Sequence, residues 1–393
     1  MKTKRESQTR VMRIIARMNV GGPAVQITGL MRGLNSEEFD HRLFTGYCSA
    51  GETDYLNSIA TDLKVVRIKG LGRHISLLDD ISAFIRLVIE IRKFKPHIIH
   101  THTAKAGFLG RIASLLSLHP SIRVHTFHGH LLNGYFGKFK KLLVVLAERC
   151  LAFFTTQLLA VGDKVREDLL EAGVGSRSNF ALMPPGLSIN ALPAKNASRK
   201  TLGLSEDRLQ CAFIGRVTQI KRPDRFLDVV SEVKKRGIAL DFFIAGDGEL
   251  LDLCRERISK ENLSVTVLGW QDNIEQVLSA ADVVVLTSDN EGTPLCLIQA
   301  GMAGLPVVTT TVGSVPEIVL DGVTGILTSL SVEMIADALE KLVSDKDLRS
   351  ELGLAARDFT LAHFGVGRLV SDHEELYKEL ITSRAKTSPK ALR

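Results

Sequence analysis

The chain is poor in the residues that support domains held together by disulfides or zinc. Its 393 residues include five cysteines and one tryptophan, and no two cysteines form a C-x-x-C pair. A scattered, odd set of cysteines excludes a zinc ribbon and a disulfide framework and indicates a reducing compartment. No apolar run reaches the roughly 18 residues of a membrane span, and the polar start MKTKRESQTR precedes no apolar segment. We therefore expect a cytoplasmic protein without a signal peptide or a membrane-spanning helix.

Several motifs that would indicate a particular function are also absent. The sequence has no G-x-G-x-x-G fingerprint, which argues against a nicotinamide dehydrogenase. It has no helix-turn-helix, zinc-finger or RNA-binding signature, so we expect no nucleic-acid partner. The acidic triplet Asp345-Lys-Asp347 falls in a charged, helical segment and indicates solvated surface rather than a metal-binding D-x-D loop.

The charge is unevenly distributed along the chain. The whole sequence carries 50 Lys and Arg against 44 Asp and Glu, a net charge of +6. Residues 1–190 hold 26 of these cations and 15 of the acids, a balance of +11, whereas residues 191–393 hold 24 and 29, a balance of −5. This asymmetry indicates two domains, the first facing an anionic membrane surface or a phosphate-bearing acceptor. A solubilising surface charge is the alternative explanation.

Short apolar segments alternate with longer amphipathic ones over most of the sequence. This alternation predicts parallel β-strands joined by helices on both faces of a sheet. The expected strands are residues 11–16, 41–44, 64–68, 98–99, 123–127 and 157–161 in the first half, and 210–214, 242–245, 265–268, 283–286 and 307–309 in the second. The sequence therefore predicts an α/β protein with two doubly wound sheets.

The predicted boundary between the domains follows Met183-Pro-Pro-Gly186, where a polar stretch begins. We expect an N-terminal domain over residues 1–187, a C-terminal domain over 188–365, and a helix with a flexible tail over 366–393. The helix should end near Leu380 and pack back on the first domain. Ligands of such folds bind at the carboxyl ends of the strands, so we expect the active site in the cleft between two facing domains.

Glycine-rich turns follow two of the expected strands. Gly21-Gly22-Pro23 lies between a strand and a helix, and residues 243–248 run from a strand into a turn that starts at Gly246. Glycine lets a backbone approach a phosphate closely, and a helix N-terminus offers free N–H donors. Tight strand-to-helix turns need glycine for their own geometry, so a purely structural interpretation stays open.

Two further strands are followed by charged or polar loops. Gly215 and Arg216 come directly after residues 210–214, and Lys221 follows five residues later. Two cations on such a loop suit a diphosphate, because Arg offers a planar fork and Lys a point charge; a solvated loop is the alternative. In residues 289–300, Glu291 and Gln299 are eight positions apart, so both can border one site. Backbone N–H groups at the intervening helix start are available to an anion or a sugar hydroxyl.

Histidines gather in one part of the first half. Seven of the eleven fall between His97 and His130, including the pairs His100/His102 and His128/His130. Each pair shares a strand face at a period of two, which is a metal-like spacing. No cysteine and no carboxylate pair lies nearby, so we expect no metal site. A sugar-facing role for His128 is the alternative, since Gly129 lets the backbone turn there.

Together these segments resemble the retaining nucleotide-sugar glycosyltransferases of family four, which have the GT-B fold of two facing Rossmann-like domains. The resemblance extends from Val11 to about Leu380. The matching motifs are Gly21-Gly22-Pro23-Ala24, HTHTAKAG at residues 100–107, VHTFHGH at 124–130, IGRV and KRPDRF within 214–226, EGTPL at 291–295 and GSVPE at 313–317. Several independent motifs in the right order argue against a chance match.

The resemblance implies a role for each matching residue. Arg216 and Lys221 correspond to the cations that neutralise the donor diphosphate, and Glu291 to the acid placed against the donor hexose. His128 corresponds to the histidine that contacts the transferring sugar. Gln299 stands where the family usually has a second Glu that binds the ribose hydroxyls. Because Gln lacks the carboxylate charge, ribose binding should be weaker.

The remaining expected contacts divide between donor and acceptor. The donor residues are Gly21, Gly22, Gly215, Gly246, Leu268, Gly292, Thr293, Pro294 and Leu295. The acceptor residues are His100, His102, Lys105 and His130. No metal and no cofactor is expected, so cations and helix N-termini should stabilise the departing diphosphate.

The activity implied by the resemblance is a retaining, metal-independent glycosyl transfer. The donor would be a nucleotide diphosphate sugar that supplies a hexose or N-acetylhexosamine, and UDP is the nucleotide expected first. The acceptor would be a glycan or lipid-linked molecule in surface polysaccharide or glycolipid biosynthesis. Two alternatives stay open: a nucleotide-sugar epimerase of the same architecture, and a degenerate sugar-nucleotide-binding protein marked by Gln299.

A basic and apolar stretch bears on where the protein works. Lys138, Lys140 and Lys141 precede five apolar residues at positions 142–146. This order suits a helix that lies on an anionic surface, so we expect peripheral attachment to the inner face of the cell membrane. A core helix with a basic start is the alternative.

Overall fold

The computed structural model describes residues 8–50, 52–129 and 138–387 and divides into two compact units. Unit 1 comprises Met1–Gly186 and Val366–Arg393, and unit 2 comprises Leu187–Gly365. Among the described residues, no helix combines the length and the apolar character needed to cross a membrane.

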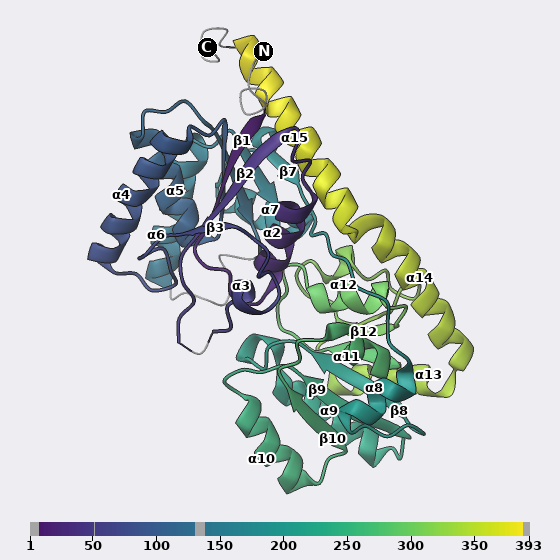
Figure 1. Cartoon of the computed structure of the whole chain (residues 1–393). Coiled ribbons are helices and arrows are strands. Elements are labelled where there is room, and N and C mark those ends of the chain that lie inside the picture. Colours follow the sequence, from purple (N-terminus) through teal and green to yellow (C-terminus); the bar gives the residue numbers. More distant parts are fainter. Residues whose placement is uncertain (1–7, 51, 130–137, 388–393) are drawn as a thin grey trace. The chain divides into compact units, whose positions relative to one another are not determined.

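Unit 1 is a seven-stranded parallel sheet with helices on both faces (Figure 1). The strand order is β3-β2-β1-β4-β5-β6-β7. The strands are β1 (Thr9–Ile15), β2 (Phe39–Thr45), β3 (Val65–Arg67), β4 (Ile98–His102), β5 (Ile122–Phe127), β6 (Gln157–Ala160) and β7 (Phe180–Leu182). The helices are α2 (Gly22–Gly33), α3 (Tyr55–Ser58), α4 (Leu77–Phe94), α5 (Ala104–Leu116), α6 (Lys138–Phe153), α7 (Asp163–Glu171) and α15 (Val366–Thr387).

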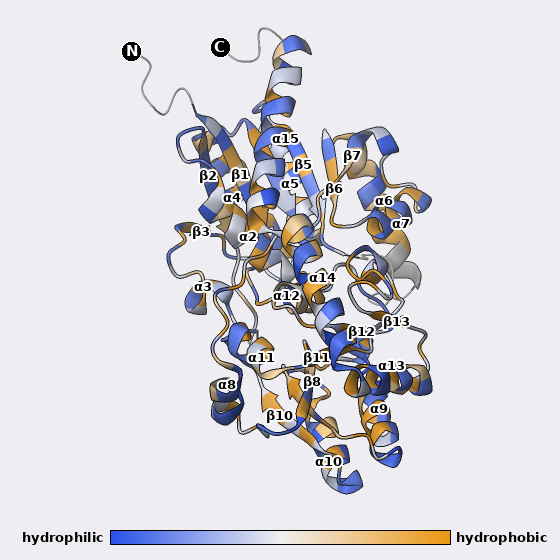
Figure 2. Ribbon diagram, turned by 90° about the vertical axis from the view of Figure 1, so that its right-hand side faces the viewer, coloured by the Kyte–Doolittle hydropathy of each residue, from blue (hydrophilic) through white to orange (hydrophobic). Residues whose placement is uncertain are grey.

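The side chains of β1 alternate between the two faces of this sheet. Met12 and Ile14 pack under α4 and α5, whereas Val11 packs under α2 and α15. Arg13 belongs to the second face because side chains two residues apart in a strand share a face. In Figure 2, blue segments interrupt the orange of the unit 1 strands, in agreement with the buried polar residues found there.

Two glycines let α15 approach α2 closely. A Cβ atom on Gly29 would lie 2.8 Å from Cγ2 of Val366, and one on Gly33 would lie 2.4 Å from Cγ2 of Val370. Both distances are shorter than a carbon–carbon contact allows, so a larger residue at either position would force a valine of α15 to shift. The C-terminal helix therefore covers the sheet of unit 1, although the whole of unit 2, Leu187–Gly365, separates it in sequence from β7.

Unit 2 is a six-stranded parallel sheet in the order β10-β9-β8-β11-β12-β13. Its strands are β8 (Leu209–Ile214), β9 (Leu240–Ala245), β10 (Val265–Gly269), β11 (Val283–Leu286), β12 (Val307–Thr310) and β13 (Ile326–Thr328). Its helices are α8 (Lys195–Leu202), α9 (Pro223–Lys235), α10 (Leu251–Glu261), α11 (Ile274–Ala280), α12 (Leu295–Met302), α13 (Val332–Ser344) and α14 (Lys346–Phe364).

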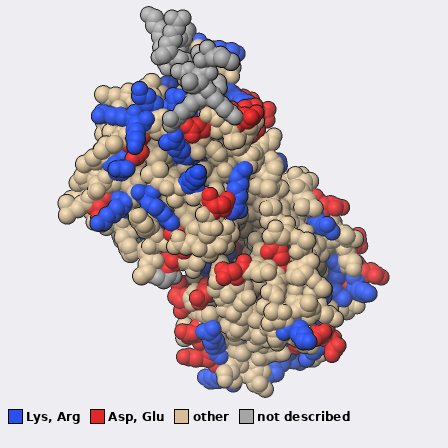
Figure 3. All heavy atoms as spheres, viewed as in Figure 1, with Lys and Arg blue, Asp and Glu red and all other residues tan. Residues whose placement is uncertain are grey.

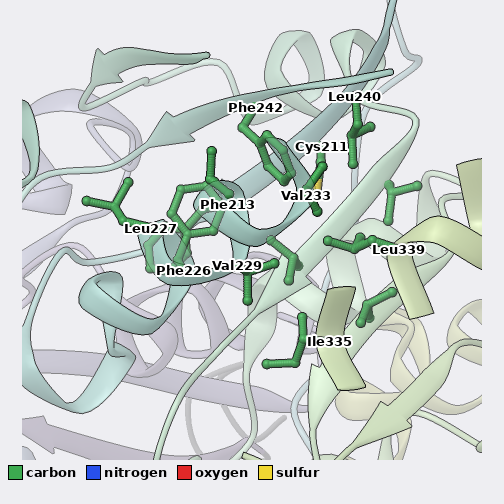
Figure 4. Close-up of a cluster of buried hydrophobic side chains, with 14 of the residues drawn as sticks. Cys211, Phe213, Phe226, Leu227, Val229, Val233, Leu240, Phe242, Ile335 and Leu339 are labelled. Carbon is green, nitrogen blue, oxygen red and sulfur yellow. The ribbon is translucent and has the colours of Figure 1, made fainter. Parts of the chain in front are cut away.

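An apolar core joins β8 and β9 to the helices α9 and α13 (Figure 4). Phe226 of α9 lies between Phe213 and Phe242, with ring centroids 5.1 and 5.8 Å away. Ile335 and Leu339 of α13 close the cluster. This packing buries the side chain of Phe213 near the carboxyl end of β8, and the loop that follows the strand includes Arg216 and Lys221.

The structure confirms the prediction of two doubly wound α/β domains, and most predicted strands differ from the observed ones by a few residues at their ends. The prediction missed the edge strands β7 and β13. It also ended the C-terminal helix near Leu380, whereas α15 continues to Thr387.

Candidate functional site

Parallel pairing brings the loops after all strands of a sheet to the same edge. In unit 2, four neighbouring strands end at this edge: β10 ends at Gly269, and β9, β8 and β11 are followed by Gly246, Gly215 and the loop that contains Glu291. From β8 the chain adds strands toward one edge of the sheet (β9, β10), and from β11 it adds strands toward the other edge (β12, β13). The position between β8 and β11 is therefore the switch point of the sheet. Ligands of doubly wound sheets bind at this position.

The central feature of this edge is an ion pair between Lys221 and Glu291. Lys221 Nζ lies 2.5 Å from Glu291 Oε1, and the two side chains are only 14% and 9% exposed. Ser288 Oγ donates a second hydrogen bond, of 2.5 Å, to the same carboxylate oxygen. Residues 70 positions apart in sequence are thereby joined at the switch point.

Further hydrogen bonds hold the two loops of this pair together. Thr287 Oγ1 donates to the carbonyl of Lys221 at 3.1 Å, and Arg225 donates to the carbonyl of Thr287 at 2.6 Å. Gly313, with φ of 52°, passes close beneath Glu291: a Cβ there would lie 1.9 Å from the Glu291 carbonyl oxygen. The motif that begins at Gly313 thus packs directly against the backbone of the loop that contains Glu291.

Two cations, Arg216 and Lys221, lie on the loop after β8 at this edge. Burial alone would lower the pKa of Lys221, but the Glu291 carboxylate outweighs burial and raises it. Lys221 is therefore an ammonium group at neutral pH. Arg216 is exposed and, within the described residues, forms no ion pair. The first turn of α12 contains no acid, which keeps the positive end of the helix dipole uncompensated within that turn.

Backbone hydrogen bonds align the other predicted donor residues of unit 2. Gly215 N donates to the carbonyl of Ala245 at 3.1 Å, and Gly246 N donates to that of Gly269 at 2.8 Å. Leu268 lies at the end of β10, beside this run. Gly292, Thr293 and Pro294 form the entry to α12, Leu295 begins that helix, and half-buried Gln299 lies one turn further on.

In unit 1, the switch point lies between β1 and β4. Gly21 and Gly22 form the start of α2 after β1, with Pro23 in the first turn and no acid there. His102 ends β4, and half-buried His128 follows β5. His102 Nδ1 lies 2.8 Å from His128 Nε2, so the structure joins these two predicted residues directly.

The structure does not bring all predicted acceptor residues to a surface. His100 is fully buried, and its ring nitrogens contact Tyr377 and Thr126. Lys105 is tied to Asp80 at 2.5 Å and donates to the carbonyl of Gly70 at 3.0 Å. His130 lies outside the described residues. We therefore do not place His100 or Lys105 at a ligand.

Three residues that the sequence patterns did not indicate are Ser288, Arg13 and Tyr377. Ser288 lies two residues after the end of the apolar strand β11, and this position after a buried strand is the signal that could have found it. Arg13 interrupts an apolar strand, and its guanidinium donates to His100 and His102 at 3.3 and 3.2 Å. This nearby positive charge is unfavourable for a metal ion on the histidine pair. Among the described residues, no three His, Cys, Asp or Glu side chains form a group that could hold a metal.

Family models match both halves of the chain. The model described as "Glycosyl transferase 4-like domain" matches residues 21–186, and "Glycosyl transferases group 1" matches residues 194–359. The chain is 29% identical to the Escherichia coli UDP-Gal:alpha-D-GlcNAc-diphosphoundecaprenol alpha-1,3-galactosyltransferase over 361 residues. The aligned region covers 89% of this chain and 92% of that protein. It is 22% identical to the Staphylococcus aureus capsular polysaccharide biosynthesis glycosyltransferase CapM, over 81% of this chain and 86% of the relative.

Solved structures resemble the chain in fold. The Anabaena protein HepE in complex with UDP has a TM-score of 0.78 and 17% identity, covering 94% of this chain and 100% of that chain. A sucrose-phosphate synthase from Thermosynechococcus elongatus has a TM-score of 0.79 and 18% identity, covering 96% of this chain and 100% of that chain. These similarities confirm the predicted GT-B class of fold.

Replacing Glu291 by Gln should destabilise unit 2, because it leaves Lys221 buried without a counter-charge. We expect a loss of about 3 kcal/mol in the free energy of unfolding at pH 7. Burial would then lower the folded pKa of Lys221 below its ordinary value of 10.5. The unfolded state would bind the extra proton at neutral pH, so the loss should shrink as the pH rises toward 10.5.

The measurement is urea denaturation at pH 7 and pH 9.5. The matched control is the double variant Lys221→Met/Glu291→Gln, which removes both charges and should cost about 1 kcal/mol or less. A Glu291→Gln protein as stable as the wild type at pH 7 would contradict the buried ion pair.

Proposed function

Since this chain belongs to the family-four-like glycosyltransferases, we propose that it transfers a hexose from a UDP-sugar to a glycan or lipid-linked acceptor, retaining the anomeric configuration and requiring no metal ion. The observation that supports this proposal most strongly is the charge pattern at the switch point of unit 2. There the exposed Arg216 lies one short loop away from the Lys221–Glu291 pair.

This charge pattern fits the leaving group of a sugar nucleotide. A departing nucleoside diphosphate gains negative charge as the bond to the sugar breaks, and fixed cations stabilise that charge in the transition state. Arg216 has no acidic partner among the described residues, so its guanidinium is available to two phosphate oxygens. Lys221 is held in place by Glu291 and supplies a second positive charge.

The remaining parts of unit 2 have roles that follow from their position. Glu291 is proposed to accept hydrogen bonds from hexose hydroxyls, helped by the backbone N–H groups at the start of α12. Gln299, on the same helix, is proposed to contact the ribose. The end of β10 near Leu268 is proposed to face the base.

UDP is the proposed nucleotide because the similar proteins point to it. The E. coli relative is named for UDP-Gal, and HepE has been solved with UDP, with UDP and glucose, and with UDP-glucose. The name of the same relative gives a diphosphoundecaprenol acceptor, which is the basis for proposing a lipid-linked acceptor here.

The proposed reaction exchanges one bond at the sugar for another. The bond between the anomeric carbon and the diphosphate oxygen breaks, and a bond from that carbon to the acceptor oxygen forms on the same face. The acceptor hydroxyl loses its proton to the departing phosphate oxygen, so no side chain has to act as the base. His128 of unit 1 is proposed to contact the transferring sugar.

We also propose that unit 1 attaches peripherally to an anionic membrane surface. On α6, Leu142 is 54% and Leu146 is 49% exposed, while Val145 is buried, so this helix is not simply a core helix. Helix α4 adds a second apolar stripe at Leu78, Ile81, Ile85 and Ile89, all exposed. Figure 3 shows Lys and Arg side chains over one face of unit 1, where they would favour anionic lipids.

Replacing Arg216 by Ala should lower turnover of a UDP-sugar about a hundredfold, because one fixed cation is lost from the transition state. The measurement is release of UDP in the presence of acceptor, after a thermal-shift screen with UDP-, GDP- and ADP-sugars. The control is Arg255→Ala, which removes an exposed arginine of α10 that pairs with Asp252. Unchanged turnover would contradict the role of Arg216.

The same assay distinguishes the two alternative functions. Turnover of the donor without an acceptor would favour an epimerase, and nucleotide binding without turnover would favour a degenerate binding protein.

Replacing Gln299 by Glu should strengthen UDP binding several-fold, because a carboxylate accepts stronger hydrogen bonds from ribose hydroxyls than an amide does. Isothermal titration calorimetry with UDP measures the change. The matched variant Gln299→Leu should weaken binding, since it removes the hydrogen bonds altogether. Equal affinities in all three proteins would show that residue 299 does not face the ribose.

Membrane attachment can be tested by liposome flotation with and without anionic lipid. We expect the wild type to float with anionic vesicles at low salt, and the variant Leu142→Ser/Ile85→Ser to float less, because both changes remove apolar side chains from unit 1. The control is Leu253→Ser/Leu354→Ser, which changes two exposed leucines of unit 2. No flotation of the wild type at low salt would refute the attachment.

A further inference from the structure

A fully buried arginine in unit 1 lacks a carboxylate partner. Arg13 lies in the middle of β1, and among the described residues no Asp or Glu forms an ion pair with it. Its Nη1 lies 3.2 Å from His102 Nε2 and 3.3 Å from His100 Nδ1, and its Nη2 lies 3.1 Å from the Tyr377 hydroxyl. The guanidinium thus donates its hydrogen bonds to neutral groups.

These contacts determine where the protons of the neighbouring rings lie. A guanidinium only donates hydrogen bonds, so His102 Nε2 must accept one. Burial, followed by the charges of neighbouring residues, lowers the pKa of His102 well below its ordinary value, so this ring is neutral. A neutral imidazole that accepts at Nε2 carries its proton on Nδ1. That proton points to His128 Nε2, at 2.8 Å.

His128 is therefore the acceptor of this hydrogen bond. Burial and the Arg13 charge lower the pKa of His128 to about 3, so this ring is neutral as well. With Nε2 accepting, the single ring proton of His128 must lie on Nδ1. Among the described residues, no group forms a hydrogen bond with His128 Nδ1.

The second branch from Arg13 is consistent with the same assignment. The Tyr377 hydroxyl accepts from Arg13 Nη2 and donates to His100 Nδ1, at 2.6 Å. His100 then carries its proton on Nε2 and donates to Thr126 Oγ1, at 2.7 Å. One arrangement of protons satisfies every contact in the cluster, and the arginine sets its direction.

We propose that Arg13 is a positioning residue that, through His102, holds His128 as a hydrogen-bond donor with its proton on Nδ1. In this state His128 has no free ring nitrogen to take up a proton, so it serves as a donor and not as a base. The fitting ligand atom is an oxygen with lone pairs, such as a sugar hydroxyl or a phosphate oxygen. The identity of that ligand depends on the function proposed above, whereas the tautomer does not.

The tautomer can be measured in the intact protein by NMR. Two-bond proton–nitrogen correlations of protein labelled with ¹⁵N-histidine distinguish a ring protonated on Nδ1 from one protonated on Nε2, and a His128→Gln spectrum identifies the signals of His128. We expect the Nδ1 tautomer in the wild type. A wild-type His128 protonated on Nε2 would overturn the proposal without any variant.

Two variants test whether Arg13 is the cause. Arg13→Met replaces the guanidinium with a shorter, uncharged and flexible side chain and removes the donor to His102, so His128 should become a mixture of both tautomers. Tyr377→Phe is the matched control, because it removes one hydrogen bond to Arg13 and leaves the path through His102 intact. An Nδ1 tautomer that persists in Arg13→Met, or is lost equally in Tyr377→Phe, would overturn the role of Arg13. Thermal unfolding verifies that both variants are folded.

Kinetics separate this inference from the proposed function. With an active donor and acceptor pair, Arg13→Met should lower kcat about tenfold and change the donor KM less than twofold, because only the direction of one hydrogen bond changes. A wild-type Nδ1 tautomer with an unchanged kcat in Arg13→Met would overturn the contact of His128 with the reacting sugar and leave the proton arrangement intact.

Discussion

Parallel strand pairing is the constraint on which the rest of this structure depends. Every strand of both sheets runs in the same direction as its neighbours, so the loops that leave the carboxyl ends must collect along one edge of each sheet. The glycines, cations and acid of unit 2 are spread over more than 70 residues of sequence, but strand order makes them neighbours. The chemistry of the protein is therefore built from loops, while the buried strands supply rigidity.

The two units handle buried charge in different ways. In unit 2, Lys221 has a carboxylate partner, and the pair remains charged because Glu291 compensates for the loss of water. In unit 1, Arg13 has only neutral partners, and the nearby histidines respond by staying unprotonated. The first arrangement keeps a cation charged at the carboxyl edge of the sheet, and the second is proposed to fix the direction of a chain of hydrogen bonds.

Much of the fold was predictable because local sequence patterns determine it. Apolar strands flanked by amphipathic helices gave a clear signal, and even the three-residue edge strand β3 was predicted, whereas β7 and β13, of the same length, were missed. The end of α15 was missed because Ser383 and the basic residues after it resemble a tail. Motif spacing brought Lys221 and Glu291 to one predicted site, but their direct contact could not be read from it.

The sequence by itself determined two doubly wound sheets and the positions of glycine, Arg216 and Glu291 after particular strands, because these features depend on local periodicity and turn chemistry. The tertiary structure alone decided which of those side chains meet and which are buried. His100 has a spacing that suits a ligand, but the packing of α15 encloses it. Arg13 meets Tyr377 across 364 residues, and such contacts depend on how whole elements pack, which no local pattern records.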